Sequence, residues 1–230
     1  MTKSVLVTGA GRGIGLAAAR LFLGSGFRVV ALDKDFSKFD LQRAERVTFD
    51  LQDLDSIPAI IAGLGEIDVL VNNAGTLYCH PHDAFPARDA LEIITVNLRA
   101  PVALIEALAP RMRKRKSGRI INVGSVAAFT GHPDLWYGAT KAALLNITKS
   151  YAGYLGKDGI LVNAVAPGPT LTDMYEQLPQ SRKDAVMRSV HSGRPCSPEE
   201  VAQAIFWLGS AAPAYISGAT LDVNNGSYPR

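Results

Sequence analysis

The sequence has little cysteine: only Cys79 and Cys196 occur among its 230 residues. Two thiols cannot form the disulfide framework that is typical of small secreted domains. No apolar run approaches the roughly 20 residues that a membrane-spanning helix needs. Residues 1–4 lead directly into the strand-like Val5-Leu6-Val7, with no apolar signal segment before it. We therefore expect a cytoplasmic protein that is neither secreted nor inserted in a membrane.

A large excess of one charge is also missing, since 24 basic and 21 acidic residues leave a formal net charge of +3. Much of the positive charge lies in one basic stretch, Arg111–Arg119, which contains no acidic residue. Cations stabilise a helix C-terminus, and Ser117-Gly118 would end the helix, so we interpret the stretch as a solvated helix end. A docking surface for a phosphate or an acidic partner is the alternative. Nucleic acid is disfavoured as a partner, because no aromatic residues interleave with these charges.

No linker, repeat or low-complexity tract divides the chain, and short apolar runs alternate with longer helical patterns. The runs are rich in Val, Ile and Leu, which predicts strands buried on both faces. They are Ser4–Thr8, Arg28–Leu32, Arg46–Phe49, Val69–Val71, Arg119–Val123, Ile160–Val165 and Thr220–Val223. The helical patterns are Gly13–Gly24, Asp53–Gly63, Ala87–Lys116, Tyr137–Gly156 and Pro198–Leu208. This alternation predicts one doubly wound α/β domain over residues 1–230, with a parallel sheet of about seven strands and helices on both faces.

The segment Met174–Pro195 interrupts the alternation. It is polar, contains Pro179 and Gly193, and shows no clear period. Long irregular segments inside compact domains are commonly lids or binding loops. We predict an irregular substrate lid over residues 174–195, with a plain surface loop as the alternative.

A glycine-rich loop, Thr8-Gly9-Ala10-Gly11-Arg12-Gly13-Ile14-Gly15, lies between the first predicted strand and an apolar helix. Glycines allow a tight turn and close approach of the backbone to a pyrophosphate, which is stabilised by the helix N-terminus. Asp33 follows at the end of the next predicted strand, where a carboxylate can accept the hydroxyls of a ribose. The spacing predicts a dinucleotide site, with a merely structural turn as the alternative.

A second motif, Tyr137-Gly138-Ala139-Thr140-Lys141, places a phenol and an ammonium on one face of a helix. A phenol is a poor acid–base group at neutral pH until a nearby cation favours its ionised form. Ser125 precedes Tyr137 at the end of a predicted strand and could donate to a reacting oxygen. A surface pair of Tyr137 and Lys141 is the alternative when the motif is taken alone.

Together these motifs resemble those of the short-chain dehydrogenase/reductase family, and the resemblance covers essentially the whole chain. Further matching pieces are Asn72-Asn73-Ala74-Gly75, Asn97 and Pro167-Gly168-x-Thr170-x-Thr172. The resemblance implies a Rossmann fold and a nicotinamide-dependent oxidoreductase that needs no metal. The 3-oxoacyl-carrier-protein reductases are nearest in general appearance.

The resemblance assigns roles to individual residues. Tyr137 would be the general acid/base, and Ser125 would polarise the substrate carbonyl or hydroxyl. Lys141 would bind the nicotinamide ribose and lower the pKa of the tyrosine, and Asn97 would hold a water in a proton relay. The implied cofactor-binding residues are Gly9, Arg12, Gly13, Ile14, Gly15, Asp33, Asp50, Leu51, Asn73, Ala74, Gly75, Tyr137, Lys141, Pro167, Gly168, Thr170 and Thr172.

Asp33 predicts a preference for NAD over NADP. Its carboxylate would accept the ribose hydroxyls of NAD and repel the 2′-phosphate of NADP. Arg12 and Lys34 act in the opposite direction, since either cation could partly neutralise a phosphate. We expect the carboxylate to dominate, because Lys34 follows it rather than replacing it.

Two further sets of residues are candidates for the substrate pocket. The Cys79–Asp83 segment combines a thiol, two imidazoles and a carboxylate, but Pro81 between the histidines makes a shared tetrahedral metal site awkward. We expect no metal there and instead a contact with substrate. His132, Leu135 and Trp136 are expected in the pocket wall, because they lie just before Tyr137.

The predicted helices over residues 101–112 and 137–156 are apolar on more than one face. Family members pair such helices across a dimer, so we expect a homo-oligomer, either a dimer or a tetramer, with the tetramer favoured.

The sequence therefore predicts an NAD(P)-dependent oxidoreductase that acts on a secondary alcohol or carbonyl, with 3-oxoacyl, sugar, cyclic-diol and hydroxysteroid substrates all open. An NADP-dependent 3-oxoacyl thioester reductase is one alternative. A dinucleotide-binding regulator without catalysis is another, which the presence of Asn97, Ser125, Tyr137 and Lys141 disfavours.

Overall fold

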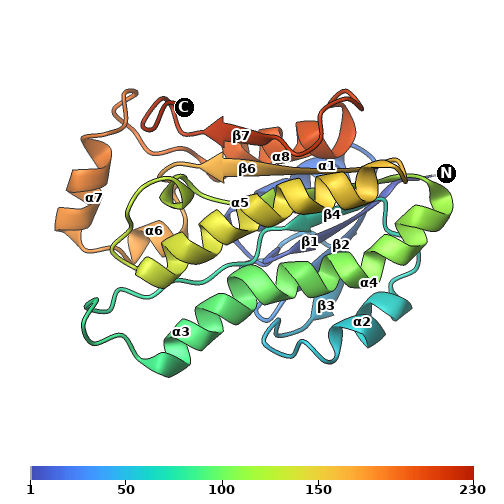
Figure 1. Cartoon of the computed structure of the whole chain (residues 1–230), viewed down its shortest axis with the longest axis horizontal. Helices are drawn as coiled ribbons and strands as arrows, with labels where there is room; N and C mark the ends of the chain where they lie inside the picture. Colours follow the sequence, from blue (N-terminus) through green and yellow to red (C-terminus); the bar gives the residue numbers. More distant parts are fainter. Residues whose placement is uncertain (1) are drawn as a thin grey trace.

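The computed structural model describes residues 2–230 and shows strands and helices alternating along the chain (Figure 1). The strands are β1 (Ser4–Thr8), β2 (Arg28–Asp33), β3 (Glu45–Thr48), β4 (Val69–Asn72), β5 (Gly118–Val123), β6 (Ile160–Pro167) and β7 (Thr220–Val223). The α-helices are α1 (Gly13–Gly24), α2 (Ile57–Gly63), α3 (Ala87–Ile94), α4 (Ala100–Arg115), α5 (Leu135–Gly156), α6 (Asp173–Glu176), α7 (Gln180–Met187) and α8 (Pro198–Ser210).

The strands form a seven-stranded sheet in the order β3-β2-β1-β4-β5-β6-β7, and every neighbouring pair is parallel. The chain moves outward from β1 to β3 and then crosses back to β4 on the other side of β1. Ligands of doubly wound sheets bind at such a switch point, beyond the carboxyl ends of the strands. The structure confirms the predicted α/β fold, its parallel sheet and its number of strands.

Buried apolar side chains cover both faces of the sheet. Alternate residues of β1 face opposite sides, so Val5 and Val7 pack with α1 and α8, whereas Leu6 packs with α2, α4 and α5. Figure 1 shows α4 and α5 in front of the sheet and α1 and α8 behind it. Burial on both faces explains why the strands lack polar alternation.

Two predicted helices differ from the observed ones. The pattern over residues 53–63 forms a helix only from Ile57, because residues 50–56 form turns around the side chains of Asp50 and Asp53. The long pattern from Ala87 is helical to Arg115, but it contains a π-helical turn at Thr95–Arg99 between α3 and α4. Such π turns are frequent at functional sites.

The segment 174–195 is not irregular as predicted, because α6 and α7 occupy much of it. Thr172 caps α6 by accepting a hydrogen bond from the amide of Tyr175 at 3.4 Å, and Pro179 precedes α7. Neither helix has a fully buried residue, which is why the sequence shows no apolar period there. Figure 1 shows both helices at the end of the sheet to which the strand arrows point.

The basic stretch Arg111–Arg119 mainly serves the fold. Arg111 donates to carbonyls at the end of α2, and Arg115 donates to the Ile67 carbonyl. Lys116 and Arg113 pair with Asp158 at 2.6 and 3.2 Å. These contacts support the interpretation as a helix end.

Among residues 2–230, no helix has the length and hydrophobicity that crossing a bilayer requires.

Arg119 offers a test of this structural role. Its guanidinium donates to the carbonyls of Leu208 and Ala212 at 2.8 and 2.9 Å, at the end of α8. Arg119→Ala is expected to lower the free energy of unfolding by about 1.5–3 kcal/mol, because two charge-assisted hydrogen bonds are lost. Chemical denaturation measures the change, with the exposed Lys114→Ala as the control that should leave stability within about 0.5 kcal/mol. Equal stability of the two variants would contradict the structural role.

Candidate active site

A cavity of about 720 Å³ opens beyond the carboxyl ends of the strands. Loops that follow β1, β2, β3, β4, β5 and β6 all contribute to its wall, together with the first turns of α5 and with residues of α6 and α7. The predicted cofactor and catalytic residues that line it are Gly9, Arg12, Gly13, Ile14, Asp33, Asp50, Leu51, Asn73, Ala74, Gly75, Ser125, Tyr137, Lys141, Pro167, Gly168, Thr170 and Thr172. The structure thus brings together segments that are distant in the sequence.

The glycine-rich loop closes tightly over the start of α1. Gly9 has a φ of +63°, in the left-handed region that favours glycine. Gly15 does not line the cavity; a Cβ there would collide with the Gly9 carbonyl oxygen, so this glycine lets the helix approach the loop. Gly13 and Ile14, at the start of α1, line the cavity, where the first amides of a helix are free to bind an anion.

Asp33 lies at the end of β2 and lines the cavity. Its two carboxylate oxygens accept the backbone amides of Gly11 and Asp35 at 2.8 and 3.1 Å. Each oxygen keeps a lone pair for a further donor. Arg12 is held between Asp35 and Asp173 by ion pairs of 3.7 and 3.8 Å, so its charge is partly neutralised within the chain.

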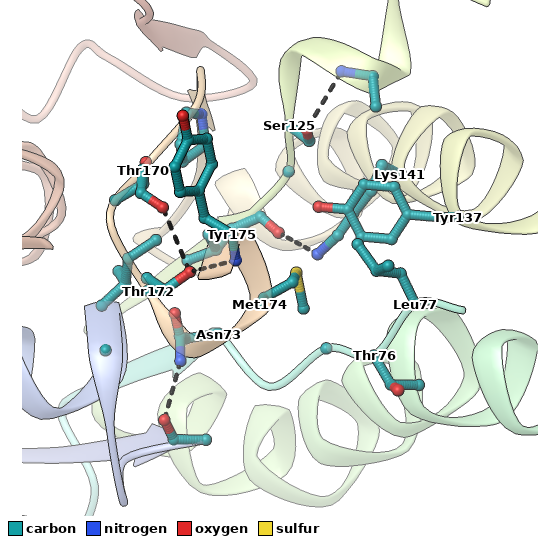
Figure 2. Close-up of a pocket in the computed structure, with 18 of the residues that line it drawn as sticks. Asn73, Thr76, Leu77, Ser125, Tyr137, Lys141, Thr170, Thr172, Met174 and Tyr175 are labelled. Atoms are coloured by element: carbon teal, nitrogen blue, oxygen red, sulfur yellow. Dashed lines mark hydrogen bonds between the residues drawn. The ribbon is translucent and has the colours of Figure 1, made fainter. Parts of the chain in front are cut away.

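Asn73 joins the loops on the two sides of the switch point. Its side-chain amide donates to the carbonyls of Thr8 and Gly9 at 3.0 and 3.1 Å, and Figure 2 marks one hydrogen bond of this side chain with a dashed line. The Thr8 hydroxyl in turn accepts the backbone amides of Asn73 and Ala74. This arrangement fixes the path of residues 73–75 along the cavity.

Ser125, Tyr137 and Lys141 lie together on one side of the cavity, facing Thr172 and Met174 across it (Figure 2). α5 begins at Leu135, because the carboxylate of Asp134 caps it by accepting the Tyr137 amide at 2.9 Å. The predicted i, i+4 pair therefore falls in the first two turns of this helix, beside the end of β5.

Lys141 is buried and donates from its Nζ to the Val123 carbonyl at 2.8 Å. Burial lowers the pKa of this ammonium to about 8. The nitrogen lies 5.6 Å from the centre of the Tyr137 ring.

The direction of the Tyr137 pKa differs from the sequence expectation. Burial raises the pKa of this phenol, and a hydrogen bond with Ser125 opposes the rise. Lys141 was expected to lower it, but the ammonium is directed to the Val123 carbonyl. The Ser125 oxygen accepts the Ala127 amide at 3.1 Å, so its proton remains available to a partner in the cavity.

Asn97 lies in the π-helical turn, is fully buried and does not line the cavity. Its side chain accepts the Thr76 amide at 2.8 Å and donates to the Thr76 carbonyl at 2.9 Å. The side chain therefore holds the strand-to-helix loop rather than pointing at a reacting group.

Several predicted pocket residues lie outside the cavity wall. Residues 79–83 do not line it; Cys79 is exposed, and His80 pairs with Asp89 at 2.7 Å. No cluster of three or more potential metal ligands occurs among residues 2–230. Leu135 and Trp136 do not line the cavity either, because they begin α5 on its outward side, whereas His132 does.

The sequence analysis missed cavity residues that come from distant segments. They are Glu92 of α3, Arg182 of α7 and Tyr228 near the end of the chain. Tyr228 stacks on Phe129 with ring centres 5.8 Å apart. No local motif marks these positions, because only the fold brings them to the cavity.

Comparison with known proteins identifies relatives of this chain over nearly its whole length. The family model for short-chain dehydrogenases matches residues 3–183. The 3-oxoacyl-[acyl-carrier-protein] reductase FabG of Vibrio harveyi is 36% identical, and the alignment covers 98% of this chain and 97% of the relative. FabG of Thermotoga maritima is 35% identical, with 97% of each chain covered.

Similar solved structures also match nearly the whole chain. A proposed gluconate 5-dehydrogenase of Beutenbergia cavernae with bound NADP has a TM-score of 0.89 and 31% identity, covering 98% of this chain and 96% of the other. A proposed 2-deoxy-D-gluconate 3-dehydrogenase of Agrobacterium tumefaciens with bound NADP has a TM-score of 0.91 and 31% identity, covering 99% and 97%.

Proposed function

The chain belongs to the short-chain dehydrogenase/reductase family of NAD(P)-dependent oxidoreductases, and from that premise we propose that it interconverts a secondary alcohol and a carbonyl with Tyr137 as general acid/base. The observation that carries the proposal is the convergence of Ser125, Tyr137 and Lys141 on the cavity that the glycine-rich loop and Asp33 also line.

The residues present fit a dinucleotide. A side chain at Gly15 would collide with the loop, and the start of α1 lines the cavity where a pyrophosphate would need backbone amides. Asp33 would hold the adenosine ribose, and Asp50 and Leu51 would lie near the adenine. Asn73, Ala74 and Gly75 would follow the ribose–phosphate path. Pro167, Gly168, Thr170 and Thr172 would surround the nicotinamide.

The nicotinamide, when bound, supplies or accepts the hydride, and the chain must supply orientation and a proton. In the reducing direction, negative charge develops on the carbonyl oxygen. The hydroxyls of Ser125 and Tyr137 both line the cavity and can donate to that oxygen, and the proton passes from Tyr137. In the oxidising direction the Tyr137 oxygen takes the proton from the alcohol. With its ammonium 5.6 Å from the centre of the Tyr137 ring, Lys141 would offset part of the rise that burial causes in the Tyr137 pKa. It would also hold the nicotinamide ribose, while Asn97 positions the Thr76 segment.

We propose the segment 174–195, with α6 and α7, as the substrate lid. Its residues Met174, Tyr175 and Val186 line the same cavity as Tyr137. We also propose a homo-oligomer, since large apolar side chains are exposed on α5, α8 and β7, namely Tyr154, Trp207 and Leu221. Its location in the cytoplasm stays a prediction.

A panel of carbonyls and alcohols, followed through the absorbance of the reduced nicotinamide, tests the proposed reaction. The panel contains acetoacetyl-CoA, keto sugar acids and uncharged ketones, each with NADH and with NADPH. FabG relatives favour a 3-oxoacyl thioester as a second candidate substrate, and the gluconate enzymes favour a sugar acid. Dinucleotide binding with no turnover of any compound would instead support a non-catalytic regulator.

We further propose that NAD is preferred over NADP, although the similar solved structures contain NADP. Both Asp33 oxygens are fixed by backbone amides and face the cavity, so a 2′-phosphate would meet a positioned negative charge. Arg12 is already paired with two carboxylates, which weakens its attraction for a phosphate.

Asp33→Ser tests this preference. Wild type is expected to favour NAD in kcat/KM by about tenfold or more, equivalent to about 1.4 kcal/mol. The variant should lose most of that margin, because the like charge is gone. Asp55→Ser is the control, since Asp55 is exposed and does not line the cavity. A wild-type preference for NADP would mean that Asp33 does not bind the ribose, and the proposed cofactor would be wrong.

A further inference from the structure

The cavity contains one cation that the proposed mechanism does not use. The cationic side chains that line it are Arg12, Lys34, Lys141 and Arg182. Arg12 is paired with Asp35 and Asp173, and Lys141 donates to the Val123 carbonyl. Lys34 is exposed and follows Asp33 at the proposed ribose end. The half-buried Arg182 therefore needs a separate explanation.

The Arg182 side chain has no ion pair or hydrogen bond to any of residues 2–230, although its neighbours on α7 do. Lys183 pairs with Glu176 at 2.9 Å, and Asp184 accepts from Gln180 at 2.7 Å. The local acids are therefore already bound to other partners. A guanidinium in a cavity, with five donors and no acceptor nearby, is suited to an anionic ligand.

Arg182 lies at the reacting end of the cavity. His132 lines the same wall as Tyr137, and the centres of the two rings are 5.1 Å apart. The charge of Arg182 is close enough to help lower the pKa of His132, for which burial is the main cause. The cavity lining thus includes a phenol, an imidazole and, from the lid, a guanidinium.

One carboxylate, Glu92 of α3, also lines the cavity. Burial is the main cause of the raised pKa of Tyr78, and Glu92 adds to it. No hydrogen bond or ion pair joins Glu92 to the Arg182 side chain. The remaining acids of the wall are Asp33 and Asp50, at the proposed cofactor end, and Asp173 of α6, which pairs with Arg12 and Lys38. Arg182 therefore has no carboxylate partner in the cavity wall.

We propose that Arg182 determines substrate specificity by binding a carboxylate, so that the preferred substrates are oxo and hydroxy acids that carry the carboxylate apart from the reacting carbon. This rests on the proposed oxidoreductase function and names its substrate class. The planar guanidinium matches a carboxylate in a bidentate manner. Because Arg182 belongs to the lid, the same contact would draw the lid onto the substrate.

A binding experiment tests the proposal without turnover. Calorimetry measures the binding of butyrate and hexanoate, each against its uncharged amide, to the enzyme saturated with NAD⁺. At least one carboxylate is expected to bind about tenfold more tightly than its amide, the factor that 1.4 kcal/mol represents. Arg182→Gln should abolish this difference, and Arg182→Lys should keep part of it.

Arg188→Gln is the matched control, because Arg188 is exposed at the end of the same helix and does not line the cavity. It should bind the acids as wild type does. No acid–amide difference in wild type, or one that survives Arg182→Gln, would overturn the proposal. An equal loss of NAD⁺ affinity would also overturn it, by assigning Arg182 to the cofactor.

Kinetic measurements separate this proposal from the proposed function. On 5-oxohexanoate and its methyl ester, Arg182→Gln should lower kcat/KM about tenfold for the acid and leave the ester unchanged. Failure of wild type to reduce any carbonyl while the carboxylate preference in binding persists would count against the oxidoreductase function alone. A loss confined to acetoacetyl-CoA, absent for its phosphate-free N-acetylcysteamine thioester, would assign Arg182 to a phosphate and overturn the carboxylate proposal.

Discussion

Replacing Tyr137 with phenylalanine is expected to lower kcat by about 10²–10⁴-fold, the range that general acid–base catalysis typically contributes. The substitution removes the hydroxyl and keeps the ring that packs beside His132. NAD(P) binding should persist, because the glycine-rich loop and Asp33 are untouched. Steady-state kinetics on the best substrate of the panel, with fluorescence titration of the reduced cofactor, measures the two effects.

Tyr215→Phe is the matched control, because that tyrosine is fully exposed and far from the cavity wall. It should keep wild-type turnover. If Tyr137→Phe retained more than about a tenth of the wild-type kcat, a different group would be donating the proton, since 1.4 kcal/mol is too little for a general acid in this role.

Lys141→Met is expected to impair turnover and cofactor affinity together, since one ammonium would serve the tyrosine and the nicotinamide ribose. We expect a fall of about 10²-fold or more in kcat/KM, comparable to the loss of acid–base assistance. Kinetics with varied cofactor and substrate concentrations separates the two contributions.

The same variant should not be less stable than wild type in the absence of cofactor. Burial lowers the Lys141 pKa from 10.5 to about 8, which corresponds to a cost of about 3 kcal/mol for the charged form. Loss of the hydrogen bond to the Val123 carbonyl opposes this by about 1–3 kcal/mol. Between pH 8 and pH 10.5 the Lys141 amine is protonated in the unfolded chain but not in the folded one. The cost of burying the charged form is therefore complete below pH 8 and disappears above pH 10.5.

Thermal unfolding at pH 7 and at pH 10 therefore measures the sign of the stability difference between Lys141→Met and wild type. The Tm of Lys141→Met relative to wild type should be highest at pH 7 and should decline as the pH rises. A large destabilisation at pH 7 would show that the ammonium stabilises the fold. The presence of a buried charge at position 141 would then be explained without a catalytic role.

The local parts of the fold could be predicted from the sequence. The apolar run Ser4–Thr8 and the glycine-bounded helix Gly13–Gly24 have the observed bounds, because turn chemistry and burial on both faces leave clear local signals. The proposed catalytic cluster could be located because Tyr137 and Lys141 share a helix face, and because parallel strands bring the loops after β5 and β6 to one edge.

The rest depends on tertiary contacts. The lid was predicted as irregular because α7 buries no residue and so shows no period. The wall residue Glu92 was missed because the fold alone brings α3 to the cavity, whereas Arg182 was included only as part of the predicted lid and not as a residue with a role. The pKa direction of Tyr137 differed because burial outweighs the neighbouring groups, and burial is not visible in a motif.

Transfer of deuterium from the nicotinamide tests the central claim most directly. The enzyme is given a carbonyl substrate with NADH or NADPH deuterated at C4, in separate reactions with each of the two C4 diastereomers. We expect one diastereomer to give an alcohol with deuterium on the carbinol carbon, and Tyr137→Phe to form that product at least about 10²-fold more slowly. An alcohol that carries no deuterium from either diastereomer, or equal rates in wild type and Tyr137→Phe, would contradict hydride transfer assisted by Tyr137 in this cavity.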